Sequence, residues 1–148
     1  MIRPITESDK DIYIELANEF FHSDAVSHPI PSRHFEDTFC ELMRSKSRVE
    51  CYLIEHNGMV CGYTLLAKFF SQEAGGEVVW IDELYIREGF RNLGLGSDTL
   101  EQIKRKFPNS AFRLEVEADN IGAKELYRKF GFSPLLYEQM FCDKYHNM

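Results

Sequence analysis

Four stretches of the chain carry an apolar residue at every third or fourth position, and each stretch predicts a helix. The first helix begins after Thr6 or Ser8, because both residue types cap helices. Its apolar face comprises Ile12, Leu16 and Phe20. Such a face is expected to pack on a core.

Prolines separate the first helix from the second. Pro29 and Pro31 interrupt regular structure, and Ser32 can then cap a helix. The apolar residues of this second helix are Phe35, Phe39, Leu42 and Met43.

The two later helices are bounded by residues that end helices. The third is expected over residues 95–107, and Pro108 stops it. The fourth is expected over residues 121–130, where Gly131 provides the usual end.

Runs of apolar, β-branched and aromatic residues predict six strands. They are Met1–Ile5, Val49–His56, Met59–Phe70, Glu77–Ile86, Ala111–Glu117 and Leu135–Cys142. Asn57-Gly58 joins the second to the third and favours a type I′ turn, which predicts a hairpin.

A strand, a glycine-bearing loop, a helix and a strand follow one another between residues 77 and 117. The helix must cross over, so strands 77–86 and 111–117 are expected to be parallel neighbours. The sequence therefore predicts an α+β fold. Its sheet is mixed and mostly antiparallel, with one central parallel strand pair and flanking helices. A single domain, 1–148, fits this length.

Net charge narrows the range of partners. The chain carries a net charge of -7. An acidic surface repels the phosphates of nucleic acids and of anionic lipids, so neither a nucleic acid nor a membrane is expected as a partner. Glu7 and Asp9 interrupt any secretory signal, which favours a cytoplasmic protein.

Four cysteines are expected to be reduced, and no metal site is expected, because neither cysteines nor histidines have ligand spacing. A two-residue hairpin turn would place Cys61 opposite Ile54 and Cys51 opposite Thr64, so that these two cysteines would not bond.

The loop before the third helix is rich in glycine. Gly94 and Gly96 lie in the run Arg91-Asn92-Leu93-Gly94-Leu95-Gly96-Ser97, between a strand and a helix. Free amides at a helix start bind anions, and Arg91 could add a charged contact to a phosphate. A third glycine at position 99 is missing, which argues against a dinucleotide-binding loop.

Two motifs resemble the signatures of the GNAT N-acetyltransferases. Arg91-x-x-Gly94-x-Gly96, after the strand Ile81–Ile86, resembles their acetyl-coenzyme A signature. Asn120-x-x-Ala123-x-x-x-Tyr127-x-x-Phe130-Gly131-Phe132 resembles the second one. The resemblance implies an enzyme that transfers an acetyl group from acetyl-coenzyme A (acetyl-CoA) to an amine.

The resemblance also implies a set of cofactor contacts. Backbone amides of the loop would hold the pyrophosphate: Asn92, Leu93, Gly94, Leu95, Gly96 and Ser97. Many relatives have glycine where this chain has Asn92, but asparagine tolerates a left-handed backbone. A side chain at Gly96 is expected to block the phosphate. Leu84, Tyr85 and Ile86 would pair with the pantetheine arm, and Asn120 and Ala123 would contact the cofactor.

Three residues are candidates for proton transfer. By resemblance, Tyr127 would protonate the leaving thiolate, although it also belongs to an apolar helical stripe that is typical of a core. Asp82 and Glu83 are the candidate bases, and similarity to polyamine acetyltransferases favours Asp82. Adjacent strand residues point to opposite faces unless a bulge intervenes. Alternatively, these carboxylates form a salt bridge at a solvated edge of the sheet, and a water molecule serves as the base.

The acceptor is expected near residues 20–34, which in the family help to form the acceptor pocket. This stretch includes Phe21, His22, Asp24 and His28, and Phe69 and Phe70 end a strand nearby. The carboxylates favour a cationic small-molecule amine, and a peptide amine is the other choice. A homodimer is compatible with the family. A non-catalytic acyl-CoA sensor and an interaction module are the alternative functions.

Overall fold

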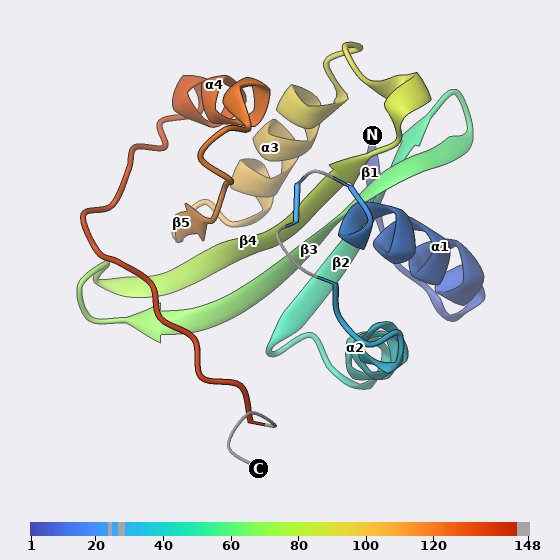
Figure 1. Ribbon diagram of the computed structural model, residues 1–148, viewed down its shortest axis with the longest axis horizontal. Coiled ribbons are helices and arrows are strands. Elements are labelled where there is room, and N and C mark those ends of the chain that lie inside the picture. The colour runs from blue at the N-terminus through green and yellow to red at the C-terminus, as the bar shows by residue number, and fades with distance from the viewer. Residues whose placement is uncertain (24, 27–28, 145–148) are drawn as a thin grey trace.

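A computed structural model of the chain describes residues 1–23, 25–26 and 29–144 (Figure 1). Its strands are β1 (Ile2–Pro4), β2 (Val49–His56), β3 (Met59–Ser71), β4 (Gly76–Ile86) and β5 (Ala111–Leu114). Its α-helices are α1 (Lys10–Phe21), α2 (Arg33–Arg44), α3 (Leu95–Lys106) and α4 (Ile121–Lys129). Two short 3-10 turns precede α1 and α3, at Glu7–Asp9 and Glu88–Phe90.

The strands of the described residues form one mixed sheet in the order β1-β2-β3-β4-β5. The first four pair antiparallel, and β4 pairs with β5 in parallel. The predicted α+β fold with one parallel pair is therefore confirmed. Because β5 lies at the edge in this arrangement, the parallel pair is not central.

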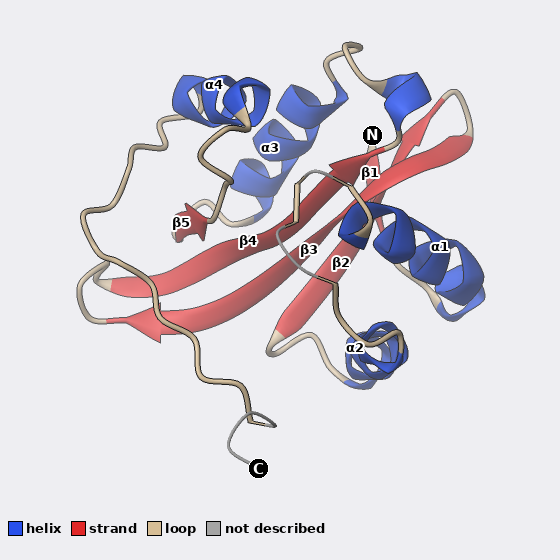
Figure 2. Cartoon of the chain, in the orientation of Figure 1, coloured by secondary structure: helices blue, strands red, loops and turns tan. Residues whose placement is uncertain are grey.

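Helices cover both faces of this sheet (Figure 2). On one face, α1 and α2 bury the apolar stripes that the sequence predicts, including Leu16, Phe20, Phe35 and Phe39. On the other face, α3 buries Leu100 and Ile103 against β3 and β4, and α4 packs beside it. The sheet therefore separates two cores, and a side chain on β4 faces one core or the other.

The β2–β3 hairpin has the predicted turn but not the predicted register. Asn57 and Gly58 both have positive φ, as a type I′ turn requires. A bulge next to Ile54 then shifts the pairing, so that Ile54 lies opposite Gly62 and Cys51 opposite Leu65. The expected pairing of Cys61 with Ile54 and of Cys51 with Thr64 was wrong by this one residue. All four cysteines are free.

The predicted last strand, Leu135–Cys142, does not form. The chain leaves α4 through Gly131 (φ 90°) and runs across the sheet without strand pairing (Figure 1). Leu136, Met140 and Phe141 are 99%, 96% and 88% exposed. The run has the composition of a strand, but β5 is only four residues long and offers a short ladder to pair with. Within the described part of the chain, no helix is long and apolar enough to cross a membrane.

Candidate functional site

A gap opens between β4 and β5. Their parallel pairing runs from Val78–Ala111 to Ile81–Leu114 and stops there. The other edge of β4 stays paired with β3 as far as Ile86. The last residues of β4 therefore form a strand with one paired edge and one open edge. The predicted strand 111–117 was too long, because β5 ends where the gap begins.

Backbone groups of β4 point into this gap. The Arg87 amide donates to the Cys61 carbonyl at 2.8 Å, so the backbone of Arg87 faces β3. Antiparallel pairing alternates, which turns the amides and carbonyls of Leu84 and Ile86 away from β3. The Arg91 Nε–H donates to the Ile86 carbonyl at 2.8 Å from that side. By the same alternation, the backbone of Tyr85 faces β3 and not the gap.

A β-bulge decides where the two adjacent carboxylates of β4 point. Glu83 lies opposite Leu65 and Ile81 lies opposite Leu66, so Asp82 is the extra residue. Ile81 packs in the core beneath α3, whereas Glu83 accepts a hydrogen bond from Tyr63 in the core beneath α1. The bulge thus brings Asp82 and Glu83 to the α1 face together.

Glu83 is a carboxyl group that ionises near neutral pH. Burial raises its pKa to about 7, and the nearby charge of Asp82 acts in the same direction. The hydrogen bond from the Tyr63 hydroxyl, 2.5 Å long, opposes this rise. Glu83 can therefore be ionised and protonated within the physiological range.

Asp82 reaches solvent beside the gap. Surrounding protein removes part of its hydration and Glu115 adds a second negative charge, and both raise the pKa of Asp82. Glu115 follows β5 directly, so the two carboxylates lie on opposite sides of the gap and give it negative charge.

The loop before α3 has the backbone that an anion site needs. Asn92 and Gly94 adopt left-handed conformations, with φ of 64° and 78°, and Gly94 caps α3. The first helical hydrogen bond joins the Asp98 amide to the Gly94 carbonyl at 3.0 Å. Amides earlier in the helix, those of Leu95, Gly96 and Ser97, therefore have no helical acceptor. Open space lies where a Cβ of Gly94 would stand, so an anion can approach the backbone there.

Gly96 lies where α3 packs closely on its neighbours. A Cβ built on Gly96 would lie 3.0 Å from Leu126 Cδ2 and 3.8 Å from Ile86 Cδ1. The glycine therefore permits close packing of α3 on α4 and β4. A side chain here would therefore disturb this packing, whether or not it also met a phosphate.

Arg91 joins the loop to the end of β4. Besides its bond to Ile86, its guanidinium lies 5.8 Å from the ring centre of Tyr85. Leu93 lies between the two left-handed residues and is 54% exposed. The predicted residues Arg91 to Ser97 thus form one turn at the open end of the gap.

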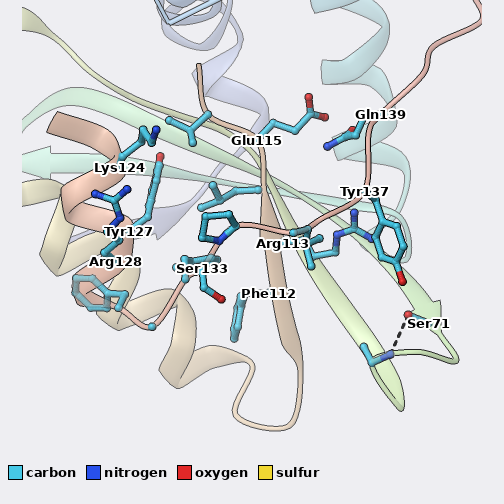
Figure 3. Close-up of a pocket in the computed structure, with 18 of the residues that line it drawn as sticks. Ser71, Phe112, Arg113, Glu115, Lys124, Tyr127, Arg128, Ser133, Tyr137 and Gln139 are labelled. Carbon is cyan, nitrogen blue, oxygen red and sulfur yellow. Dashed lines mark hydrogen bonds between the residues drawn. The ribbon is translucent and has the colours of Figure 1, made fainter. Parts of the chain in front are cut away.

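Tyr127 lies on α4, on the opposite face from Glu83. Its ring packs edge-on against Phe132 at 5.8 Å, and burial raises its pKa. Among the described residues, no group forms a hydrogen bond with its hydroxyl. Tyr127 also lines a cavity of about 750 Å³ beside β5 (Figure 3). It is both a core aromatic, as the apolar stripe suggests, and a phenol with an unused hydroxyl.

Asn120 and Ala123 occupy the start of α4. The Asn120 side chain accepts the Ala123 amide at 3.3 Å and caps the helix. This local hydrogen bond accounts for both residues structurally.

The expected acceptor residues that the structure describes do not converge on one pocket. Phe21 packs on Phe35 at 5.5 Å, and His22 Nδ1 lies 2.7 Å from the Asn18 carbonyl. Phe70 is 80% exposed, whereas Phe69 packs on Trp80. Asp24 and His28 lie outside the described residues.

The sequence does not predict a charged network that lies beside the gap. Arg87 forms ion pairs with Glu15 and Glu19, both at 2.8 Å, and the Tyr85 hydroxyl donates to Glu19 at 3.1 Å. These contacts tie α1 to the end of β4. No local pattern could reveal them, because more than sixty residues separate the partners.

The family of the chain follows from comparison with known proteins. Residues 10–132 match the acetyltransferase (GNAT) family. The chain therefore belongs to the GNAT acetyltransferase family. Such an enzyme uses acetyl-CoA and an acetyl acceptor. No protein of curated function matches this sequence.

Solved structures share the fold at low sequence identity. A possible acetyltransferase from Clostridium difficile 630 has a TM-score of 0.80 and 18% identity, over 99% of this chain and 98% of that one. An aminoglycoside 6'-N-acetyltransferase from Acinetobacter haemolyticus has a TM-score of 0.75 and 17% identity, over 97% and 98%. A ribosomal-protein-alanine N-acetyltransferase from Brucella melitensis biovar Abortus 2308 has a TM-score of 0.71 and 14% identity, over 97% and 99%.

The residues around the gap fit the donor that the family implies. Free helix amides and the open space at Gly94 suit a diphosphate, and the open edge of β4 suits an arm that contains amide groups. Within residues 1–23, 25–26 and 29–144, no group of three histidine, cysteine or acidic residues gathers to hold a metal ion.

Replacing Gly94 with alanine tests the loop. Gly94→Ala adds a methyl group in the open space and strains a left-handed residue, so we expect coenzyme A affinity to fall about tenfold. Gly75→Ala is the matched control, because Gly75 has φ of 80° and equally open surroundings in the β3–β4 turn. Both variants should lose similar stability. Calorimetry showing wild-type affinity in both would refute the assignment of the loop.

The raised pKa of Glu83 makes stability depend on pH. The folded state holds the proton more tightly than the unfolded chain, whose carboxyl has an ordinary pKa of 4.5, so stability falls as pH rises from about 4.5 to about 7. Glu83→Gln removes this loss. Relative to wild type, the variant should gain up to about 3 kcal/mol in unfolding free energy between pH 5 and pH 8. Urea unfolding at both pH values measures it, and an equal difference at the two would contradict the assignment.

Proposed function

We propose that the protein transfers an acetyl group from acetyl-CoA to a primary amine by direct attack, with a tyrosine as general acid. The observation that carries this proposal is the gap between β4 and β5, with Glu83 on one face and Tyr127 on the other. An acceptor can approach from the α1 face and the donor from the α3 face. The amine and the thioester then meet at the open edge of β4.

Glu83 is proposed as the general base. A free alkylamine has a pKa of about 10 and arrives as a cation, which the charges of Asp82, Glu83 and Glu115 attract. A carboxylate with a pKa near 7 is a stronger base than an ordinary one. Asp82 supplies charge beside it. The pKa of about 7 therefore favours Glu83 as the base, and either carboxylate can also act through a water molecule.

The open edge of β4 is proposed to stabilise the attacked carbonyl. The amides of Leu84 and Ile86 point into the gap and need no reorganisation to donate a hydrogen bond to a developing oxyanion. The loop from Asn92 to Ser97 is proposed to hold the diphosphate and to fix where the thioester lies along this edge. Arg91 adds positive charge to the same turn.

Tyr127 is proposed to protonate the leaving sulfur. Burial raises the pKa of its phenol, so the hydroxyl keeps its proton at neutral pH. The amine nitrogen forms a bond to the acetyl carbon, and the carbon–sulfur bond breaks. Glu83 takes one proton from the ammonium so that the nitrogen can attack, and the nitrogen loses its second proton to solvent after the new bond forms. Tyr127 gives its proton to the thiolate and regains one from solvent.

The names of the similar structures agree with an amine acceptor. One acts on an aminoglycoside and one on a ribosomal-protein alanine. The negative gap favours a cationic small-molecule amine for this chain.

Removal of the phenolic hydroxyl tests the mechanism. Tyr127→Phe keeps the ring that packs on Phe132, so coenzyme A affinity and the melting temperature should stay close to wild type. Acetylation of an amine substrate should slow by roughly 10²–10⁴-fold in kcat. Tyr52→Phe is the matched control, because it removes the hydroxyl of another buried tyrosine, which donates to Glu50 on β2. Equal kcat for wild type and Tyr127→Phe across the pH range would exclude the acid role.

A further inference from the structure

Arg113 on β5 is a half-buried cation without a carboxylate partner among the described residues. Its Nε is buried and makes no hydrogen bond. Its guanidinium carbon lies 5.1 Å from the ring centre of Trp80, its neighbour on β4. A stacked guanidinium keeps its in-plane N–H groups available. Because a partly dehydrated charge without an anion is costly, this side chain calls for an explanation.

Arg113 lies on the acceptor face of the sheet. Its neighbours Phe112 and Leu114 pack in the core beneath α3, so Arg113 points the other way. Trp80 lies between Val79 and Ile81, which also pack beneath α3. The bulge at Asp82 keeps Glu83 on the same face as Trp80. Figure 3 shows Tyr127 on one side of β5, and Arg113 and Glu115 on the other.

Opposite charges on this face are separated along the strand. The charge of Glu115 acts on Asp82 across the gap, and among the described residues Glu115 forms no ion pair with Arg113. Two residues of extended chain separate Glu115 from Arg113, which corresponds to about 7 Å. On this face the carboxylates of Asp82 and Glu115 therefore lie at the gap, and the cation Arg113 lies farther along β5, away from the gap.

Space is available beside Arg113. The cavity of about 750 Å³ is bounded on this side by Arg113, Glu115 and Tyr137, and it is large enough for a small metabolite. The nearby Glu73 already accepts the Tyr137 hydroxyl at 2.8 Å. Two other cations of the lining, Lys104 and Lys124, bind backbone carbonyls.

We propose that Arg113 binds a carboxylate of the acceptor, so that the acceptor is an amino acid whose amine and carboxylate are separated by several methylene groups. Arg113 lies opposite Trp80, and Trp80 lies three residues before Glu83 on β4. This inference rests on the proposed function, since it takes the amine to lie at Glu83. An acceptor of this kind binds in one orientation, because its ammonium is attracted to the gap and its carboxylate is repelled there. Arginine can hold a carboxylate through two parallel hydrogen bonds.

Two acceptors of equal chain length test the inference on the full chain with acetyl-CoA. ω-Aminohexanoate carries a carboxylate five methylene groups from its amine, and hexylamine carries a methyl group instead. We expect kcat/KM for ω-aminohexanoate to exceed that for hexylamine by about tenfold or more, mainly through KM. In Arg113→Gln this ratio should fall to near one, and Arg113→Lys should restore part of it. Arg105→Gln, an exposed arginine paired with Glu101, should keep the wild-type ratio.

The outcomes separate this inference from the proposed function. If wild type turns over hexylamine and gains nothing from the carboxylate, the inference is wrong and the amine acetyltransferase stands. A fall in both activities of Arg113→Gln with an unchanged ratio would show a structural role and would also overturn it. Should the variant not fold, the wild-type ratio and Arg113→Lys still decide. Failure of both amines to be acetylated would refute the proposed function itself.

Discussion

The structure depends on one asymmetry in how β4 is paired. Its edge toward β3 is hydrogen-bonded along the whole strand, whereas its edge toward β5 is paired only as far as Ile81. Because β3 holds the strand in place, the open edge keeps its extended shape without a second neighbour. The amides of Leu84 and Ile86 thus stay fixed without a strand partner, in a position where a ligand can use them, and the Ile86 carbonyl beside them accepts from Arg91.

Two faces meet at this open edge, and the bulge at Asp82 determines what each presents. Without the extra residue, Asp82 and Glu83 would point to opposite faces, and one carboxylate would enter the core beneath α3. With it, both carboxylates lie on the α1 face and Tyr127 lies on the other. The contacts of Arg87 with Glu15 and Glu19 hold α1 against the same end of β4, so α1 keeps a fixed position beside the acceptor face.

Local signals in the sequence account for most elements of the fold. The turn at Asn57-Gly58, the apolar stripes of α1 and α2 and the left-handed Asn92 follow from the conformations of single residues or from periodicity. The two bulges could not be found this way, since an extra residue in a strand leaves no local mark. The run from Leu135 to Cys142 has the composition of a strand but forms none. Composition alone does not provide a neighbouring strand with a free edge to pair with. The close contact of Gly96 with Leu126 could not be predicted either, because thirty residues separate the two in the chain.

Amide hydrogen exchange of β4, residue by residue with and without coenzyme A, tests the central claim most directly. The amides of Leu84 and Ile86 point into the gap, whereas the amide of Tyr85 is already paired with β3. The account predicts that coenzyme A slows exchange at Leu84 and Ile86 and leaves Tyr85 nearly unchanged. If coenzyme A left the exchange rates of Leu84 and Ile86 unchanged, the account would be contradicted, because the open edge would then not be the place where the donor binds.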